Sequence, residues 1–268
     1  MLRKIWAFIK KDFLVESSYK LSFFLNIFGI MLSLLTYFFI DKLFGNRISA
    51  HLLEFRVNYF SYVLLNMAFF SYLGTGMTSF HTQIRQEQIQ GTLESILLAP
   101  VKIPVFLLSL AMWNLIFASL NVLIYILLGI FLFKIDFSNI NFISAIVILL
   151  LSIATFSGLG IISASFVMIF KRGNPLGWMI NALEGLLGGV YFPVSVMPRF
   201  LQVLAKFLPI TYGIRAMQFA VYKGASVSEL KIEICCLILF ALILLPLGLF
   251  FFRYALKKAR RQGSLSQY

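Results

Sequence analysis

Charged side chains are scarce in this sequence, and acidic ones most of all. Only 12% of the 268 residues are charged and only 10 are Asp or Glu, whereas 60% are hydrophobic and 30 are phenylalanine. A chain this poor in charge cannot enclose so much apolar surface in one soluble core with a surface of ordinary polarity. The composition therefore predicts an integral membrane protein.

Motifs for nucleotide, metal and nucleophilic chemistry are also missing. The sequence has no G-x-x-x-x-G-K-[ST], no H-E-x-x-H, no G-x-S-x-G and no Cys and His spacing suited to zinc. Its two cysteines, Cys235 and Cys236, are adjacent, and neighbouring side chains on a helix point about 100° apart, which does not suit a structural disulfide. We expect no catalytic site, no metal and no cofactor in this chain, and these absences disfavour an intramembrane enzyme.

Six apolar segments are long enough to cross a membrane. A hydrocarbon layer of about 30 Å takes roughly 20 helical residues, and none of the segments shows the alternation of β-barrel strands. We expect an all-α protein with transmembrane helices at residues 21–44, 57–82, 103–133, 138–170, 175–192 and 232–254. They would form one transmembrane domain over residues 1–268.

Basic residues are distributed unevenly between the loops of this arrangement. They gather in residues 1–20, between the second and third spans, after the fourth span and in the tail at 255–268, so the positive-inside rule places both termini in the cytoplasm. Residues 1–20 have the spacing of an amphipathic helix in the membrane interface. Attraction to anionic lipid headgroups explains the net charge of +13, so we expect a cell-membrane protein with no nucleic-acid partner.

A polar stretch, RQEQIQGTLESILLAP, interrupts the apolar chain at residues 85–100. We expect one helix over residues 84–99, ended by Pro100. Gly91 would let a partner's backbone approach closely, and Thr92 can hydrogen-bond locally. An apolar face would be formed by Ile89, Leu93, Ile96 and Leu97, and a polar face by Glu87, Gln90 and Glu94. From spacing alone, an ordinary solvated connector fits as well as a docking element.

The segment EQIQGTLESILLAPV at residues 87–101 resembles the loop after the second span in the membrane subunits of ABC-2 type transporters, a permease family of drug, polysaccharide and teichoic acid exporters. The resemblance covers nearly the whole chain. It implies a cytoplasmic coupling helix that docks on a separate ATP-binding subunit, through Glu87, Gly91, Thr92, Glu94, Leu97 and Pro100. ATP and Mg²⁺ would bind to that partner.

A symmetric pathway would need two copies of this chain with two copies of the ATPase. The implied function is export of an amphiphilic substrate, such as a drug, lipid, glycan or glycoconjugate. A secondary transporter or channel without an ATPase is the alternative. It is disfavoured because only one ionisable residue lies well inside a predicted span.

Residues 196–222 are too polar and too often broken by proline to cross a membrane, yet too apolar for a free loop. We expect two short helices that enter the outer leaflet and return. The same resemblance implies external re-entrant helices near an outer gate. Within LPITYGIRAM, Pro209 and Tyr212 match the family's Pro-x-Tyr-like turn loosely.

Glu184 is the one acid well inside a predicted span. An ionised carboxylate at the membrane centre costs at least about 2.5–3.5 kcal/mol on insertion scales. We therefore expect Glu184 either to face a wet pathway or subunit seam, or to hold two helices together through hydrogen bonds. The sequence leaves both roles open.

Overall fold

The computed structural model of the chain describes Trp6, Lys10, Phe13, Leu14 and residues 20–48, 52–55, 57–98, 103–170 and 174–261. These residues form helices and connecting turns, and no strand occurs among them. The prediction of an all-α fold is confirmed. The predicted interfacial helix at residues 1–20 lies outside the described residues except for the four named ones and Lys20, and so do Pro100 and residues 262–268 of the predicted tail.

Four of the helices are long and apolar enough to cross a membrane. They are α2 (Lys20–Ile48), α5 (Ile103–Phe131), α6 (Phe142–Phe170) and α10 (Lys231–Arg261), and the apolar part of α2 is Lys20–Phe44. Predicted spans at 21–44, 103–133, 138–170 and 232–254 fall on these helices. α10 continues seven residues beyond the predicted end at 254, so the first part of the predicted basic tail is helical.

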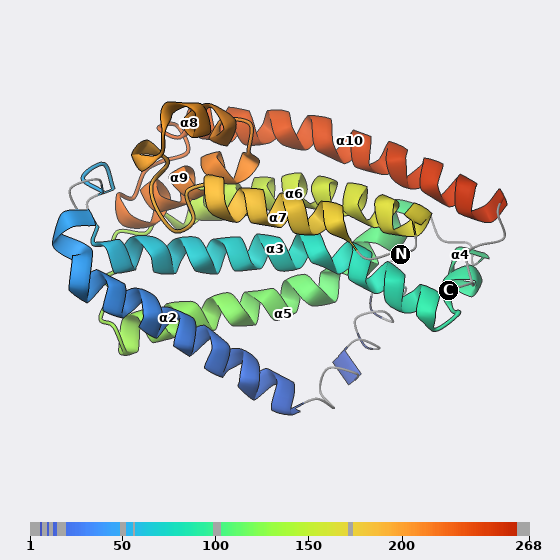
Figure 1. The fold of residues 1–268 in the computed structure, drawn as a ribbon, viewed down its shortest axis with the longest axis horizontal. Coiled ribbons are helices and arrows are strands. Elements are labelled where there is room, and N and C mark those ends of the chain that lie inside the picture. Colours follow the sequence, from blue (N-terminus) through green and yellow to red (C-terminus); the bar gives the residue numbers. More distant parts are fainter. Residues whose placement is uncertain are drawn as a thin grey trace.

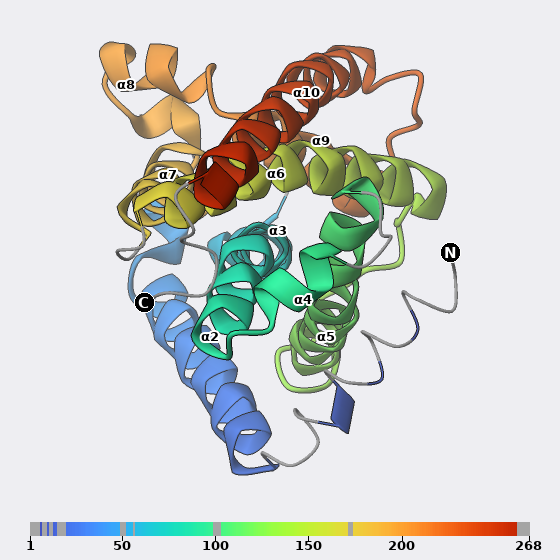
Figure 2. The same cartoon turned by 90° about the vertical axis from the view of Figure 1, so that its right-hand side faces the viewer.

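The central helix is α3 (Tyr59–Ile89), which packs against both α5 and α6 (Figure 1). With 31 residues it has a length of about 46 Å. It carries more polar residues than the four apolar helices, and many of these, such as Asn66 and Gln83, are buried by the helices around it. α2 makes fewer contacts and diverges from the bundle, as Figures 1 and 2 show.

The predicted fifth span at 175–192 is helical only in its first part. The helix α7 covers only Pro175–Leu187, which is 13 residues or about 20 Å, too short for a hydrocarbon layer of about 30 Å. Helix geometry ends at Gly188, and Gly189 has a φ of +89°, a backbone conformation that favours glycine. Pro193 follows. The helix therefore stops inside the apolar run.

The broken segment at 196–222 forms short helices, as predicted. A 3₁₀ turn at Val194–Val196 is followed by α8 (Arg199–Ala205) and α9 (Pro209–Tyr222). α9 packs against α6, α10 and α3, and its carbonyl at Ala220 accepts the N–H of Asn141 at the start of α6, at 2.9 Å. This attachment places α8 and α9 at the end of the molecule where α3 begins, opposite α4 (Leu93–Leu98) (Figure 1).

Glycine allows close backbone contacts between helices of the bundle. A Cβ on Gly158 of α6 would lie 2.7 Å from the carbonyl carbon of Leu244 on α10, and one on Gly160 would lie 2.6 Å from the carbonyl oxygen of Met77 on α3. Small residues drive helix association within membranes because they let backbones approach. α6 is therefore held closely between α3 and α10.

Candidate functional site

The predicted single helix over residues 84–99 is two helices with a turn between them. α3 extends to Ile89, and α4 begins at Leu93. Gly91 has a φ of +70°, its N–H donates to Gln88 O, and the N–H of Thr92 donates to Glu87 O at 3.0 Å. These are the bonds of a Schellman motif, in which a left-handed glycine ends a helix. The chain therefore turns at Gly91, where one continuous helix was expected.

Glu87 lies inside this turn. It is 3% exposed, and its carboxylate accepts a short hydrogen bond from the Thr92 hydroxyl. The sequence had placed Glu87 on a polar face with Gln90 and Glu94. Because the helix ends at Gly91, Glu87 and the residues after the turn do not share one helical face. Its carboxylate is therefore part of the internal structure of the turn.

The base of the turn is anchored in the helix bundle. Ile84 of α3 and Leu93 of α4 are fully buried, in one cluster with Phe106 of α5 and Leu256 of α10. Figure 2 shows α4 at the end of the molecule facing the viewer, beside α3 and α5. Leu93 of α4 therefore belongs to an apolar cluster to which three long helices, α3, α5 and α10, also contribute.

The tip of the turn is exposed. Ile89 has 63% of its surface accessible, and Gln90, Gly91 and Thr92 are also exposed. A Cβ on Gly91 would meet no atom within 4 Å. The backbones of Glu94 and Leu97 are helical within α4, while their side chains and Pro100 lie outside the described residues. An apolar side chain and open backbone thus face outward above a buried base.

Glu184 lies near the opposite end of the molecule and joins two helices. It is 2% exposed, and its Oε2 accepts the backbone N–H of Ile210 at 3.2 Å. Ile210 is the second residue of α9, directly after Pro209. The N-terminus of a helix carries unpaired N–H groups and partial positive charge, which a carboxylate satisfies. The structure thus joins Glu184 to the turn at Pro209.

A buried polar network, not foreseen from the sequence, surrounds the break after α7. The Tyr62 hydroxyl donates to Gly189 O at 2.7 Å, and Asn66 Nδ2 donates to the same oxygen and to Val190 O. Gln218 of α9 donates to Asn66 Oδ1 at 2.6 Å. Irregular backbone at membrane depth persists only where protein or water satisfies it. Asn66, a polar residue in the apolar run at 57–80, was the signal in the sequence.

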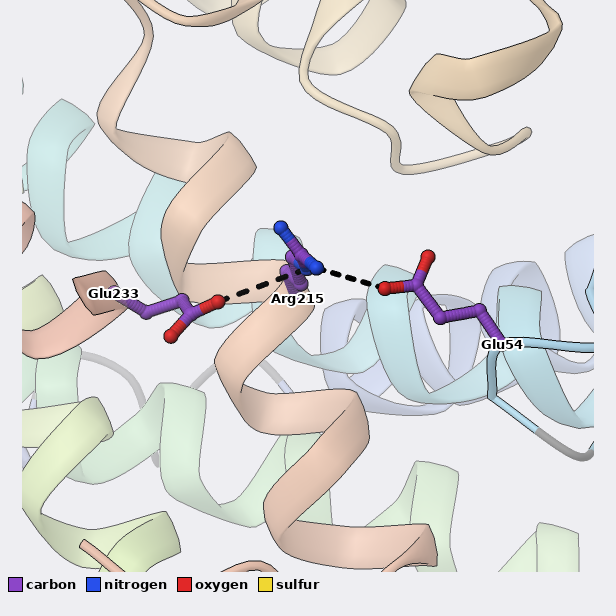
Figure 3. A network of polar contacts seen from close by, with 3 residues as sticks. All are labelled: Glu54, Arg215 and Glu233. Atoms are coloured by element: carbon purple, nitrogen blue, oxygen red, sulfur yellow. Dashed lines mark hydrogen bonds and ion pairs between the residues drawn. The ribbon is translucent and has the colours of Figure 1, made fainter. Parts of the chain in front are cut away.

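Arg215 links three elements at this end of the molecule (Figure 3). Its Nη2 lies 2.8 Å from Glu54 Oε1 in the segment before α3, and its Nε lies 3.6 Å from Glu233 Oε1 on α10. Arg215 itself belongs to α9. The sequence indicated acids in these segments but not their pairing, because residues 54 and 215 are 161 positions apart.

A pocket of about 350 Å³ lies beside this network. Its lining includes Arg215, Lys206 and Tyr212, and the Tyr212 hydroxyl donates to Lys206 O at 3.0 Å. Of the two predicted gate residues, Tyr212 lines this pocket. Pro209 directly precedes Ile210, whose N–H donates to Glu184 of α7. Among the described residues, no three His, Cys, Asp or Glu side chains gather as metal ligands would.

Two comparisons with known proteins give matches to this chain. Residues 3–222 match the ABC-2 type transporter family. The chain is also similar to the linearmycin resistance permease protein LnrN of Bacillus subtilis (strain 168), with 28% identity over 107 residues. That alignment covers 40% of this chain and 28% of the length of LnrN, so the similarity spans less than a third of that relative. Because the family match covers most of the sequence, this chain belongs to the ABC-2 type transporter family.

Proposed function

We propose that this chain is the membrane subunit of an ATP-driven exporter. The observation that carries the proposal is the α3–α4 turn, whose exposed tip at Ile89–Thr92 stands on a base buried in one apolar cluster with residues of α5 and α10. A docked partner that moved the tip would move the long helices attached to it. A solvated connector would not need a buried base of this kind.

The partner in this proposal is a separate ATP-binding subunit in the cytoplasm. It holds ATP and Mg²⁺, since this chain carries no P-loop motif. Two copies of this chain and two of the ATPase form the complex around a two-fold axis. Glu87 and Thr92 set the shape of the turn, and Gly91, Glu94, Leu97 and Pro100 belong to the surface or hinge that meets the ATPase.

The chain crosses the membrane six times in this proposal, with both termini in the cytoplasm. α2, α3, α5, α6 and α10 each cross once, and α7 crosses together with the irregular segment that follows it. α8 and α9 then lie on the external side. Glu184, Pro209 and Tyr212 belong to the outer gate, where the bond from Glu184 to α9 couples α7 to the external helices.

The proposed cargo is amphiphilic. The family implies no single substrate, and the name of LnrN, a linearmycin resistance permease, favours a noxious small molecule over a glycan. The pocket beside Arg215 joins apolar walls at Phe55 and Ile214 to the charged groups of Lys206 and Arg215, which suits a molecule with both kinds of surface.

A site-specific cross-linking experiment tests the proposal. Cys235 and Cys236 are replaced by serine, and a single cysteine is introduced at the exposed Gln90 to carry a photoreactive probe. The probe at Gln90 should capture an ATP-binding subunit in the native membrane, and a matched probe at Ser195, exposed at the other end, should not. The purified chain should hydrolyse no ATP until that subunit is added. Hydrolysis by the chain alone, or no ATPase captured from Gln90, would end the proposal.

A further inference from the structure

An apolar groove runs between α5 and α6, with residues of α3 at its base. It encloses about 300 Å³ and lies toward the end of the molecule where α9 packs. Its walls include Val122 and Ile126 of α5, Ala145 and Leu149 of α6, and Leu65 and Phe69 of α3. Both α5 and α6 pack against α3, and the groove follows the space between them.

The lining and the position of the groove indicate what fills it. α5 and α6 are two of the four helices long and apolar enough to span the membrane, so the opening between them faces lipid hydrocarbon. Water would find almost no polar partner along these walls. An acyl chain matches both the chemistry of the lining and the medium outside it.

A separate polar pocket of about 420 Å³ lies beside the groove, at the end where α9 packs. The ring of Phe137, which lines the groove, stacks on Tyr222, which lines the polar pocket, with ring centroids 5.8 Å apart. The loop between α5 and α6 serves both spaces, because Phe137 belongs to the groove while Lys134 and Asp136 belong to the pocket. An apolar and a charged compartment are therefore adjacent.

The charged groups of the polar pocket have a defined pattern. Asp41 and Asp136 supply two carboxylates and Lys134 one ammonium group. The backbone N–H groups of Tyr59 and Phe60 donate to the Asp41 carboxylate, while its Oδ1 is buried without a further hydrogen-bond partner among the described residues. Asp136 accepts the N–H of Ser138 at 2.9 Å, which lowers the pKa of its carboxyl group and keeps it ionised. Lys134 has a φ of +54°, a backbone conformation rarely kept by lysine without support from its surroundings.

We propose that the groove and the polar pocket together bind one phospholipid with a primary ammonium headgroup. One acyl chain lies in the groove between α5 and α6. The headgroup lies in the pocket, where its ammonium group donates to Asp41 and Asp136 and its phosphate pairs with Lys134. A choline headgroup has no N–H to donate to the buried Asp41 oxygen, and a glycerol headgroup has no positive charge for the second carboxylate.

Photolabelling of the full chain in bilayer nanodiscs tests the acyl-chain part. The probe is phosphatidylethanolamine with a photoreactive group in one acyl chain, and labelled peptides are mapped by mass spectrometry. Labels should concentrate on the groove faces of α5 and α6. Ser119→Trp with Ala145→Phe fills the groove and should reduce this labelling at least about fivefold. The matched control, Leu123→Trp with Ile143→Phe, adds the same rings at exposed positions outside the groove and should label like the parent.

Competition with unlabelled lipids tests the headgroup part. Phosphatidylethanolamine should compete several-fold better than phosphatidylcholine or phosphatidylglycerol. Asp41→Asn with Asp136→Asn should remove this preference while acyl labelling persists, and Glu229→Gln, which removes an acid elsewhere, should preserve it. All variants are first checked for parental thermal unfolding. Equal labelling of the filled and control variants, or equal competition by the three lipids, would overturn the proposal.

Discussion

The carboxylate of Glu184 and the backbone N–H of Ile210 meet at 3.2 Å in the interior of the molecule. The bond joins the last turn of α7 to the first turn of α9, and it is reinforced by close packing. A Cβ on the neighbouring Gly188 would lie 2.0 Å from Ile210 Cγ2. The acid that looked from the sequence like a candidate for a pathway therefore caps a helix. A movement of α9 away from α7 would break this hydrogen bond.

Substitution of Glu184 separates a capping role from a charge role. Glu184→Gln keeps an acceptor oxygen for the Ile210 N–H, so we expect near-parental stability and transport. Glu184→Leu leaves that buried N–H unpaired, at a cost of about 1–3 kcal/mol. Thermal unfolding of the purified protein and an export assay measure the two effects. A Gln variant that stays stable but loses transport would show that the charge itself serves the pathway.

Substitutions of Gly91 should destabilise the turn by an amount that depends on how readily the new residue adopts a positive φ. Because a Cβ there has open space around it, the cost arises from the φ of +70° and not from a clash. Gly91→Val should cost about 1–2 kcal/mol or more, whereas Gly91→Asn should cost less. The yield of complex with the ATPase, relative to membrane insertion of the chain, reports the effect.

Ser95→Val is the control for this comparison, since it places the same side chain on the exposed surface of α4. It should leave the yield of complex unchanged. If Gly91→Val and Gly91→Asn behave alike, the left-handed turn does not control docking.

The two ion pairs of Arg215, with Glu54 and with Glu233, should contribute unequally to the stability of the protein. Arg215 and Glu54 are both about half exposed, so their pair should contribute below about 1 kcal/mol and weaken in salt. The Glu233 side chain is 8% exposed, so it loses more when Arg215 is removed. Double-mutant cycles of Arg215→Gln with Glu54→Gln and with Glu233→Gln measure both coupling energies. A larger coupling to Glu54 would contradict this order.

Several features of the fold could be predicted from the sequence because they depend on local composition. The scarcity of charge predicted helices in a membrane, and Pro198 and Pro209 predicted the short helices α8 and α9. The early end of α7 was also visible in principle, at Gly188, Gly189 and Pro193. It was missed because apolar content continues through these residues and conceals the change in backbone conformation.

Other features could not be predicted because they depend on contacts between distant residues or on a single backbone angle. Glu87 was expected on one polar helical face with Gln90 and Glu94, but the left-handed conformation of Gly91 brings the Thr92 hydroxyl to the Glu87 carboxylate. The sequence alone does not show whether a glycine within a helical stretch has a positive φ. The pairing of Arg215 with Glu54 and Glu233 requires the packing of α9 between α3 and α10, which no local pattern encodes.

Glycine to alanine substitutions should lower the stability of the protein when made in α6 and raise it when made in α2. Gly158→Ala places a Cβ 2.7 Å from the backbone of Leu244, so α6 and α10 must separate, and overpacking of this kind costs about 1–3 kcal/mol. Gly29→Ala meets no atom within 4 Å and should stabilise α2 by about 0.5–1 kcal/mol, since alanine favours the helix. Gly129→Ala is intermediate, because its nearest contact at 3.2 Å is the flexible end of the Leu64 side chain. Measured in one detergent, the unfolding temperature should therefore fall in the order Gly29→Ala, parent, Gly129→Ala and Gly158→Ala. A Gly158→Ala protein as stable as the parent would show that α6 and α10 do not pack this closely.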